Sequence, residues 1–278
     1  MTLALPQSFD LTGQVAVVTG GGGLLGTEHG HALAEVGATV ILADINEDAA
    51  QAAASAVNRS GYAGRAIAGR IDVTKEASIK ALSERLIREV GMVRILVNNA
   101  AIDPKVQADA LVETSRLEHF SLEQWHFQVE VGLTGAFLCS KVFGTQMATA
   151  GNGVILNIAS DLAVFAPDQR LYRRDGLPED QQPVKPITYS VIKTGLLGLS
   201  RYLATYWANQ NVRSNALSPG GIFNGQGEEF VQRLSALIPL NRMARRGEYR
   251  AAVQFLCSDA SAYMTGQNIV MDGGRSAW

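Results

Sequence analysis

Cysteine is scarce in this sequence. Only Cys139 and Cys257 occur among the 278 residues, and each lies inside an apolar stretch. This usage favours two buried small hydrophobic side chains over a disulfide or a cysteine metal site, and it suits a reducing, cytoplasmic compartment. No partner with metal-ligand spacing accompanies His119 or His126, so we expect no metal.

A charge excess and a long hydrophobic run are also missing. The formal net charge is −2, and the basic residues are scattered along the chain. This distribution lacks the basic patch of a nucleic-acid or membrane surface, so we expect neither partner. No run reaches about 18 apolar residues, which excludes an obvious membrane span. The first ten residues lack a basic segment and a long apolar core, so we expect no signal peptide.

Short β-branched apolar runs do occur, and they alternate with segments of helical periodicity. The runs predict strands at Val15–Thr19, Thr39–Ala43, Ala66–Ile71, Val93–Asn98, Val154–Ile158, Val212–Leu217 and Asn268–Met271. The periodic segments predict helices at Leu24–Val36, Glu47–Asn58, Lys75–Val90, Leu122–Ala148, Tyr189–Ala208, Glu228–Ala236 and Arg246–Cys257. This alternation predicts a doubly wound α/β fold, with a seven-stranded parallel sheet and helices on both faces.

The length and a hydrophobic content of 47% predict one domain over residues 1–278. Two stretches, Ala101–Phe120 and Asp161–Thr188, exceed ordinary loop length and follow the ends of predicted strands. Ligands bind at that edge of an open α/β sheet, so both stretches are candidates for the wall of a substrate site.

A glycine-rich turn joins the first predicted strand to the first predicted helix. This order brings backbone amides and a helix N-terminus against a pyrophosphate, which indicates dinucleotide binding. The expected contacts in the turn are Gly20, Gly22, Gly23, Leu24, Leu25 and Gly26.

Asp44 ends the second predicted strand. A carboxylate there can accept hydrogen bonds from both adenosine ribose hydroxyls and would repel a 2′-phosphate. Ile45 follows where an Arg or Lys would help to bind NADP, so the sequence favours NAD as the cofactor. The alternative is that Asp44 only caps the next helix.

With these motifs the chain resembles the short-chain dehydrogenase/reductase family over nearly its whole length, which implies a Rossmann-like fold. The turn from Thr19 to Gly26 is similar to the family's Thr-Gly-x-x-x-Gly-x-Gly, with Leu24 at the middle glycine. The resemblance also implies cofactor contacts from three further segments. These are Asp72 and Val73, then Asn99, Ala100 and Ala101 (which replaces a usual glycine), and then Pro219, Gly220 and Ile222.

Tyr189 and Lys193 lie four residues apart on one predicted helix. This spacing places the phenol and the ammonium on one helix face, where the cation can lower the phenol's pKa. The resemblance implies that Tyr189 is the general acid/base, that Lys193 also binds the nicotinamide ribose, and that Ser160 bonds the substrate oxygen. A serine at a strand end is otherwise often only a cap. The family's further catalytic Asn aligns with Gly132, which weakens the expected proton relay but can accommodate a helix kink.

Residues 161–188 hold an insertion between Ser160 and Tyr189 that we expect to cover a small-molecule substrate like a lid. Its Arg170, Arg173 and Arg174 could bind a carboxylate or phosphate, or could pair with acids on a solvated loop. The insertion also resembles a family branch linked to bacterial surface-glycan and nonulosonic acid synthesis, which implies a polar sugar or sugar-acid substrate. The alternatives are a 3-oxoacyl or small-alcohol reductase and a non-catalytic NAD-binding regulatory subunit. The family resemblance and two apolar helices imply a homotetramer.

Overall fold

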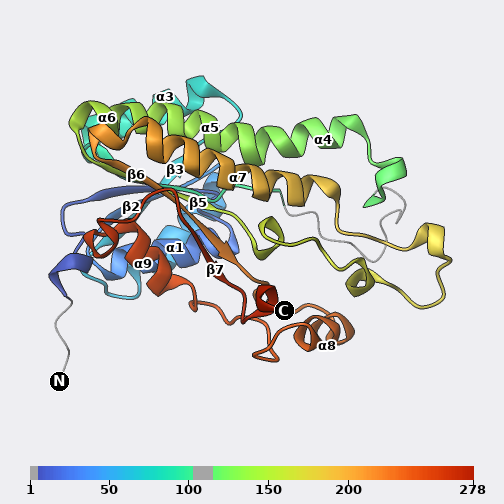
Figure 1. Ribbon diagram of the computed structural model, residues 1–278. Coiled ribbons are helices and arrows are strands. Elements are labelled where there is room, and N and C mark those ends of the chain that lie inside the picture. Colours follow the sequence, from blue (N-terminus) through green and yellow to red (C-terminus); the bar gives the residue numbers. More distant parts are fainter. Residues whose placement is uncertain (1–5, 103–114) are drawn as a thin grey trace.

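A computed structural model describes residues 6–102 and 115–278. In it a parallel sheet runs through the middle of the molecule in the order β3-β2-β1-β4-β5-β6-β7 (Figure 1). Its strands are β1 Val15–Thr19, β2 Thr39–Asp44, β3 Arg65–Arg70, β4 Val93–Asn98, β5 Gly153–Ile158, β6 Val212–Pro219 and β7 Asn268–Met271. The order reverses between β1 and β4, which creates the crevice at the carboxyl edge of the sheet where such folds bind ligands.

Helices cover both faces of the sheet, as predicted. On one face pack α1 (Leu24–Glu35), α2 (Glu47–Asn58) and α9 (Arg250–Cys257). On the other pack α3 (Glu76–Glu89), α7 (Ile187–Tyr206) and the helical stretch that contains α4 (Leu122–Val129), α5 (Gly135–Cys139) and α6 (Thr145–Ala150). Helix α8 (Glu228–Ala236) stands apart from both layers (Figure 1). The inner strands β1, β2, β4 and β5 carry mainly apolar side chains because both of their faces are buried, whereas β3 and β7 at the sheet edges are partly exposed.

The helical stretch from α4 to α6 is one rod, as its periodicity predicts, but it is not regular throughout. The π-helical turns Glu130–Thr134 and Ser140–Gly144 interrupt it. Such single π turns often mark functional sites. The expected irregularity at Gly132 is therefore present, because Gly132 lies in the first of these turns.

The expected strands and helices all form, and the differences are at their ends. Helix α7 begins at Ile187 rather than Tyr189, because Pro186 fixes its own backbone just before the first turn. Helix α9 begins at Arg250 rather than Arg246, because Gly247 has a φ of 86° and interrupts the helical backbone.

The predicted loop at 101–120 lies mostly outside the described residues, whereas the insertion at 161–188 is described throughout. It contains short 3-10 turns at Asp161–Ala163, Gln169–Tyr172 and Glu179–Gln181. Leu171 and Tyr172 pack on Phe230 and Leu234 of α8, in an apolar cluster separate from the two main cores. The insertion and α8 therefore form one cover. Within residues 6–102 and 115–278 no helix has the length and apolar character needed to cross a membrane.

His29 of α1 is a buried titratable group in this fold. Its side chain is 1% exposed, and its Nε2 has no hydrogen-bond partner among the described residues. Burial lowers the pKa of the His29 imidazole from 6.5 to about 3; the positive charge of Lys193 lowers it further, and a hydrogen bond with Asn99 opposes the shift. The folded protein therefore holds His29 neutral at neutral pH.

We expect the free energy of unfolding to fall on acidification between the unfolded pKa of 6.5 and the folded pKa of about 3. In that window the unfolded chain binds a proton that the folded chain does not, which costs at most about 1.4 kcal/mol per pH unit. His29→Gln should flatten the decline. Urea denaturation of both proteins at about pH 7 and pH 5 measures this difference, and parallel declines would contradict it.

Candidate active site

The glycine-rich turn brings backbone close to backbone. Gly20 has a φ of 63°, and a Cβ on it would lie 2.9 Å from the Cα of Ala100. A Cβ on Gly26 would lie 2.1 Å from the carbonyl oxygen of Gly20. Helix α1 begins directly after Gly23, which caps it without a side-chain hydrogen bond. The turn thus brings the N-terminus of α1, which is capped by a glycine, to this end of the site, which fits a pyrophosphate.

Thr19 and Asn99 cross-link this turn to the end of β4. The Thr19 hydroxyl accepts hydrogen bonds from the backbone amides of Asn99 (3.0 Å) and Ala100 (3.1 Å). The Asn99 side chain donates in return to the carbonyls of Thr19 (2.9 Å) and Gly20 (3.2 Å). Asn99, a predicted cofactor contact, therefore also supports the turn. Thr19 supports the turn as well, a role that the sequence did not indicate for it.

Asp44 ends β2 beside the turn. Its Oδ2 accepts a hydrogen bond from the Gly22 amide and its Oδ1 from the Asn46 amide, both at 3.0 Å. The side chain that caps α2 is Asn46, which accepts from the Ala49 amide at 3.0 Å. The alternative of Asp44 as the helix cap is therefore wrong.

A second cavity adjoins this end of the site, and it contains basic residues that sequence analysis did not find. Ile45 and Asp72 line it, together with Arg70, Lys75 and Arg85. Arg70 lies directly across the sheet from Asp44, in register on β3. The neighbours of Asp44 along the chain gave no signal of it, because the cation belongs to the adjacent strand.

Asp72 is committed to its own turn. Its carboxylate accepts hydrogen bonds from the amide and hydroxyl of Thr74 and pairs with Lys75 at 3.0 Å. The hydrogen bonds and the cation hold the pKa of Asp72 below its ordinary value, although partial burial opposes this. Val73 is 8% exposed and lies in the core.

The main cavity, of about 570 Å³, runs from the glycine-rich turn to the insertion. It gathers most of the predicted site from distant parts of the chain. The predicted residues that line it are Gly20, Gly23, Leu24, Leu25, Gly26, Asp44, Asn99, Ala101, Ser160, Tyr189, Lys193, Pro219, Gly220 and Ile222. Gly22, Ile45, Asp72, Val73 and Ala100 do not line it. One cavity thus connects the turn that fits a dinucleotide with the predicted catalytic residues.

Tyr189 and Lys193 lie on α7 at the centre of this cavity. Lys193 is 6% exposed, and its Nζ donates to the carbonyl oxygen of Ile158 at 2.8 Å. That Nζ lies 5.8 Å from the centroid of the Tyr189 ring, and the Nζ of Lys185 lies 3.8 Å from it on the approach to the helix. Two lysine cations therefore lie close to the Tyr189 ring.

Gly132 faces the same helix. A Cβ on Gly132 would lie 2.8 Å from the Cγ2 of Ile192, the residue before Lys193. An asparagine at position 132 would therefore clash with Ile192 unless the backbone or the Ile192 side chain moved. The π turn is present, and the lack of a side chain at Gly132 lets the two helices pack closely.

The insertion's arginines do not line the cavity. Arg170 makes a two-pronged ion pair with Asp168, at 2.9 and 2.7 Å, and its side chain is 80% exposed. Arg173 makes an ion pair with Glu179. The expectation that these side chains face the substrate is wrong for both, and the solvated-pair alternative holds. The insertion presents Leu171, Tyr172 and Lys185 to the cavity instead.

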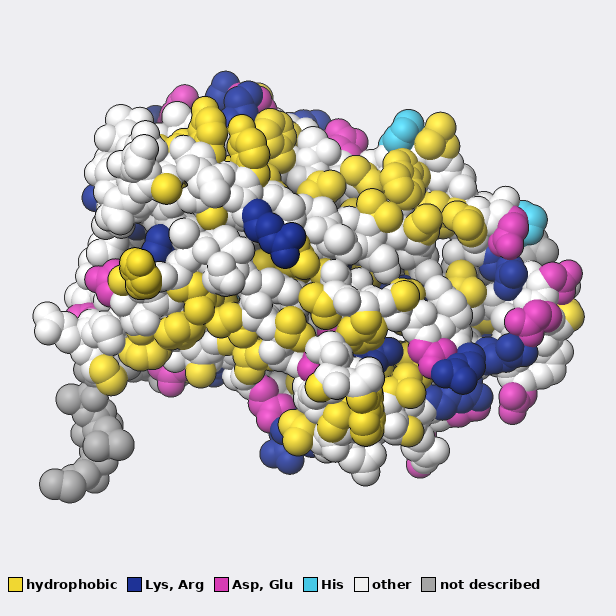
Figure 2. Space-filling view, viewed as in Figure 1, with side chains coloured by type: hydrophobic (Ala, Val, Ile, Leu, Met, Phe, Trp, Pro, Cys, Tyr) yellow, Lys and Arg dark blue, Asp and Glu magenta, His cyan; other side chains and the backbone are white. Residues whose placement is uncertain are grey.

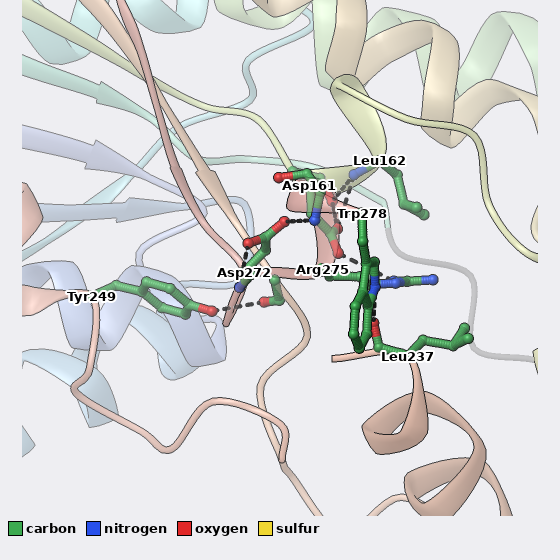
Figure 3. Close-up of polar contacts among 11 residues, drawn as sticks. Asp161, Leu162, Leu237, Tyr249, Asp272, Arg275 and Trp278 are labelled. Carbon is green, nitrogen blue, oxygen red and sulfur yellow. Dashed lines mark hydrogen bonds and ion pairs between the residues drawn. The ribbon is translucent and has the colours of Figure 1, made fainter. Parts of the chain in front are cut away.

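An ion pair that sequence analysis missed borders Ser160. The Ser160 hydroxyl donates to Asp161 Oδ1 at 2.9 Å, and Asp161 Oδ2 accepts from Arg275 Nη1 at 3.2 Å. Figure 3 shows Arg275 reaching Asp161 from the segment that follows β7. Burial raises the pKa of the Asp161 carboxyl, while the Ser160 hydrogen bond and the charge of Arg275 oppose the rise.

The sequence matches two family descriptions. Residues 14–172 match short chain dehydrogenase, and residues 180–276 match Enoyl-(Acyl carrier protein) reductase. Among solved structures, a gluconate 5-dehydrogenase from Burkholderia cenocepacia in complex with NADP and tartrate is 27% identical with a TM-score of 0.80, covering 98% of each chain.

Two enzymes resemble the chain along nearly all of its length. The D-threitol dehydrogenase of Mycolicibacterium smegmatis is 32% identical, over 98% of this chain and 96% of its own. The NAD-dependent glycerol dehydrogenase of Listeria innocua is 31% identical, over 96% of each. Sequence, fold and site agree that this chain is an oxidoreductase of the short-chain dehydrogenase/reductase family.

Proposed function

We propose that the protein is an NAD(H)-dependent dehydrogenase or reductase that interconverts an alcohol and a ketone on a polyol or sugar derivative. The observation that carries the proposal is the single cavity that joins the glycine-rich turn to Ser160, Tyr189 and Lys193. In this proposal residues 1–278 form one catalytic domain, and the insertion at 161–188 together with α8 covers the substrate.

The cavity residues divide the chemistry among them. When bound, the nicotinamide supplies or accepts the hydride. In oxidation Tyr189 takes the hydroxyl proton of the substrate, and in reduction it returns a proton to the ketone oxygen. Lys193 stabilises the phenolate by its charge, and its hydrogen bond to the Ile158 carbonyl fixes its ammonium where it would bind the ribose of a bound cofactor. Ser160 holds the reacting oxygen as its charge changes.

The related enzymes support a polar substrate, because their names include threitol, glycerol and galactitol dehydrogenases. The cavity wall supports it too, since the ion pair of Asp161 and Arg275 would be costly beside an acyl chain. This argues against the 3-oxoacyl alternative, although a 3-oxoacyl-[acyl-carrier-protein] reductase of Thermotoga maritima is 30% identical. Ser160, Tyr189 and Lys193 all line the same cavity, which argues against a non-catalytic subunit. The surface-glycan branch stays a prediction.

NAD rather than NADP is supported by Asp44, whose carboxylate lies against the glycine-rich turn. A 2′-phosphate in that place would meet its negative charge. Arg70 in the adjoining cavity is the feature that favours NADP. We give Asp44 more weight because it lies in the main cavity, whereas Arg70 does not line it.

We expect wild-type protein to bind NADH more tightly than NADPH in fluorescence titrations. Asp44→Ala should lower that preference by about tenfold or more, because it removes ribose hydrogen bonds and the repulsion of a phosphate. Arg70→Met is the matched control and should weaken only NADPH binding. Equal or reversed affinities of the wild-type protein would refute the preference for NAD.

Tyr189→Phe should reduce turnover by at least about 100-fold, because it removes the transferable proton and keeps the ring. Its NADH affinity should stay near that of the wild type. Lys193→Ala should weaken both NADH binding and turnover, since one side chain serves both. Steady-state kinetics with fluorescence titration measures the two effects, and near-normal turnover of Tyr189→Phe would exclude this mechanism.

We also propose a homotetramer that uses the outer face of the α4–α5 stretch and α7. Hydrophobic side chains gather over these helices in Figure 2. The exposed ones are Leu122, Phe127, Phe137, Ile187, Val191, Tyr202 and Tyr206. Adjacent exposed apolar residues on two helices indicate an interface.

Light scattering at micromolar concentration should report four chains, and Phe137→Glu should shift the population to smaller species, because it places a charge in the interface. A monomeric wild-type protein would contradict this assembly.

A further inference from the structure

The segment that follows β7 contributes Arg275 to the wall of the main cavity. Asp272 accepts hydrogen bonds from the amides of Gly274 (2.9 Å) and Ser276 (2.7 Å), which fixes the turn on both sides of Arg275. Trp278 donates from its indole Nε1 to the carbonyl of Leu237 at 3.3 Å, beyond the same turn (Figure 3). Arg275 is thus held in place by contacts made by its neighbours.

The Arg275 guanidinium is enclosed and incompletely paired. Its side chain is 9% exposed, and its guanidinium carbon Cζ lies 4.8 Å from the centroid of the Phe165 ring. Among the residues that the structure describes, it donates one hydrogen bond, from Nη1 to Asp161, and its Nε has no partner. A guanidinium has five N–H donors, and leaving them unpaired inside a protein is costly. Arg275 also lines the main cavity, so a ligand there can accept hydrogen bonds from guanidinium N–H groups other than the buried Nε.

The position of the Arg275 guanidinium relative to Ser160 determines which part of a bound substrate it contacts. A single carboxylate, that of Asp161, spans the Ser160 hydroxyl and Arg275. If Ser160 holds the reacting oxygen, the substituent on the next carbon of the substrate lies beside the ion pair. The pair offers an acceptor and a donor with no net charge, which matches a hydroxyl group. A substrate carboxylate at that place would meet the negative charge of Asp161.

We propose that Arg275, held by Asp161, binds the hydroxyl on the carbon next to the reacting carbinol, and so selects neutral vicinal diols over simple alcohols and 2-hydroxy acids. This inference rests on the proposed function. Asp161 is a positioning residue for Ser160 and Arg275. When Ser160 turns its hydrogen toward a substrate, Asp161 keeps the Leu162 amide (2.9 Å) and Arg275 as partners.

Three probes that differ in one group test the inference: butan-2-ol, butane-2,3-diol and lactate, each with NAD. The wild-type protein should have its highest kcat/KM on the diol. Arg275→Met should lower kcat/KM on the diol by about 10- to 100-fold, mainly through KM, as expected for a lost hydrogen bond to a charged group. Its kcat/KM on butan-2-ol, which lacks the second hydroxyl, should fall by a clearly smaller factor, so the preference for the diol should shrink.

Arg170→Met is the matched control, because Arg170 pairs with Asp168 outside the cavity; it should leave all three values unchanged. Arg275→Met also leaves Asp161 buried without its cation, so Asp161→Asn/Arg275→Met keeps the test valid if the single variant does not fold. The double variant should lose the preference for the diol as well. Asp161→Asn alone should lower kcat on both alcohols, because Asp161 acts through Ser160.

An equal loss on butan-2-ol and the diol in Arg275→Met, or no loss, would overturn the assignment of Arg275. A wild-type preference for lactate that disappears in Arg275→Met would show that the group binds a carboxylate, which also overturns it. No turnover of any alcohol by the wild-type protein, with either cofactor, would instead contradict the proposed function itself.

Discussion

The contact between the ends of β1 and β4 is the constraint on which the site depends. Thr19 and Asn99 exchange four hydrogen bonds with each other's backbone and its neighbours, at the point where the strand order reverses. These bonds fix the path of the turn that follows Thr19, and glycines allow that path because no side chain fits between the two backbones. The amides at the start of α1 are consequently held open at the mouth of the cavity. Asn99 also touches His29, so the acid sensitivity of this buried histidine belongs to the same support.

Close approach also explains how the chain departs from its family's pattern. At Gly132 the space of a side chain is taken by Ile192, which stands between Tyr189 and Lys193 on α7. The same two segments also pack closely at Gly195 of α7. A Cβ on Gly195 would lie 3.0 Å from the Leu133 side chain. The π turn at Gly132 remains, so the backbone device is kept while the asparagine is lost. Lys193 donates a hydrogen bond to the carbonyl of Ile158 at the end of β5.

Sequence reasoning found the parts of the fold and site that follow from local pattern. Hydrophobic periodicity predicted the strands and helices, the end of a predicted strand indicated Asp44, and the spacing within one predicted helix indicated Tyr189 and Lys193. It failed where partners meet only through folding. Arg70 lies opposite Asp44 on the neighbouring strand, and Arg275 pairs with Asp161 over 114 positions of sequence separation. The insertion's arginines were misjudged for a related reason, because their nearest acids lie within a few residues and satisfy them locally.

The pair of Asp161 and Arg275 has little justification as a stabilising device alone. Moving two charges out of water costs several kcal/mol per ion, and a pair with unpaired donors does not recover that cost well. The same contact makes sense as part of a site, because a polar ligand completes the hydrogen bonds that the protein leaves open. Its two halves come from the start of the insertion and from the segment after β7. In the proposed function, substrate choice thus depends on two segments outside the sheet, while proton transfer and cofactor binding depend on residues at the sheet edge and on the helices beside it.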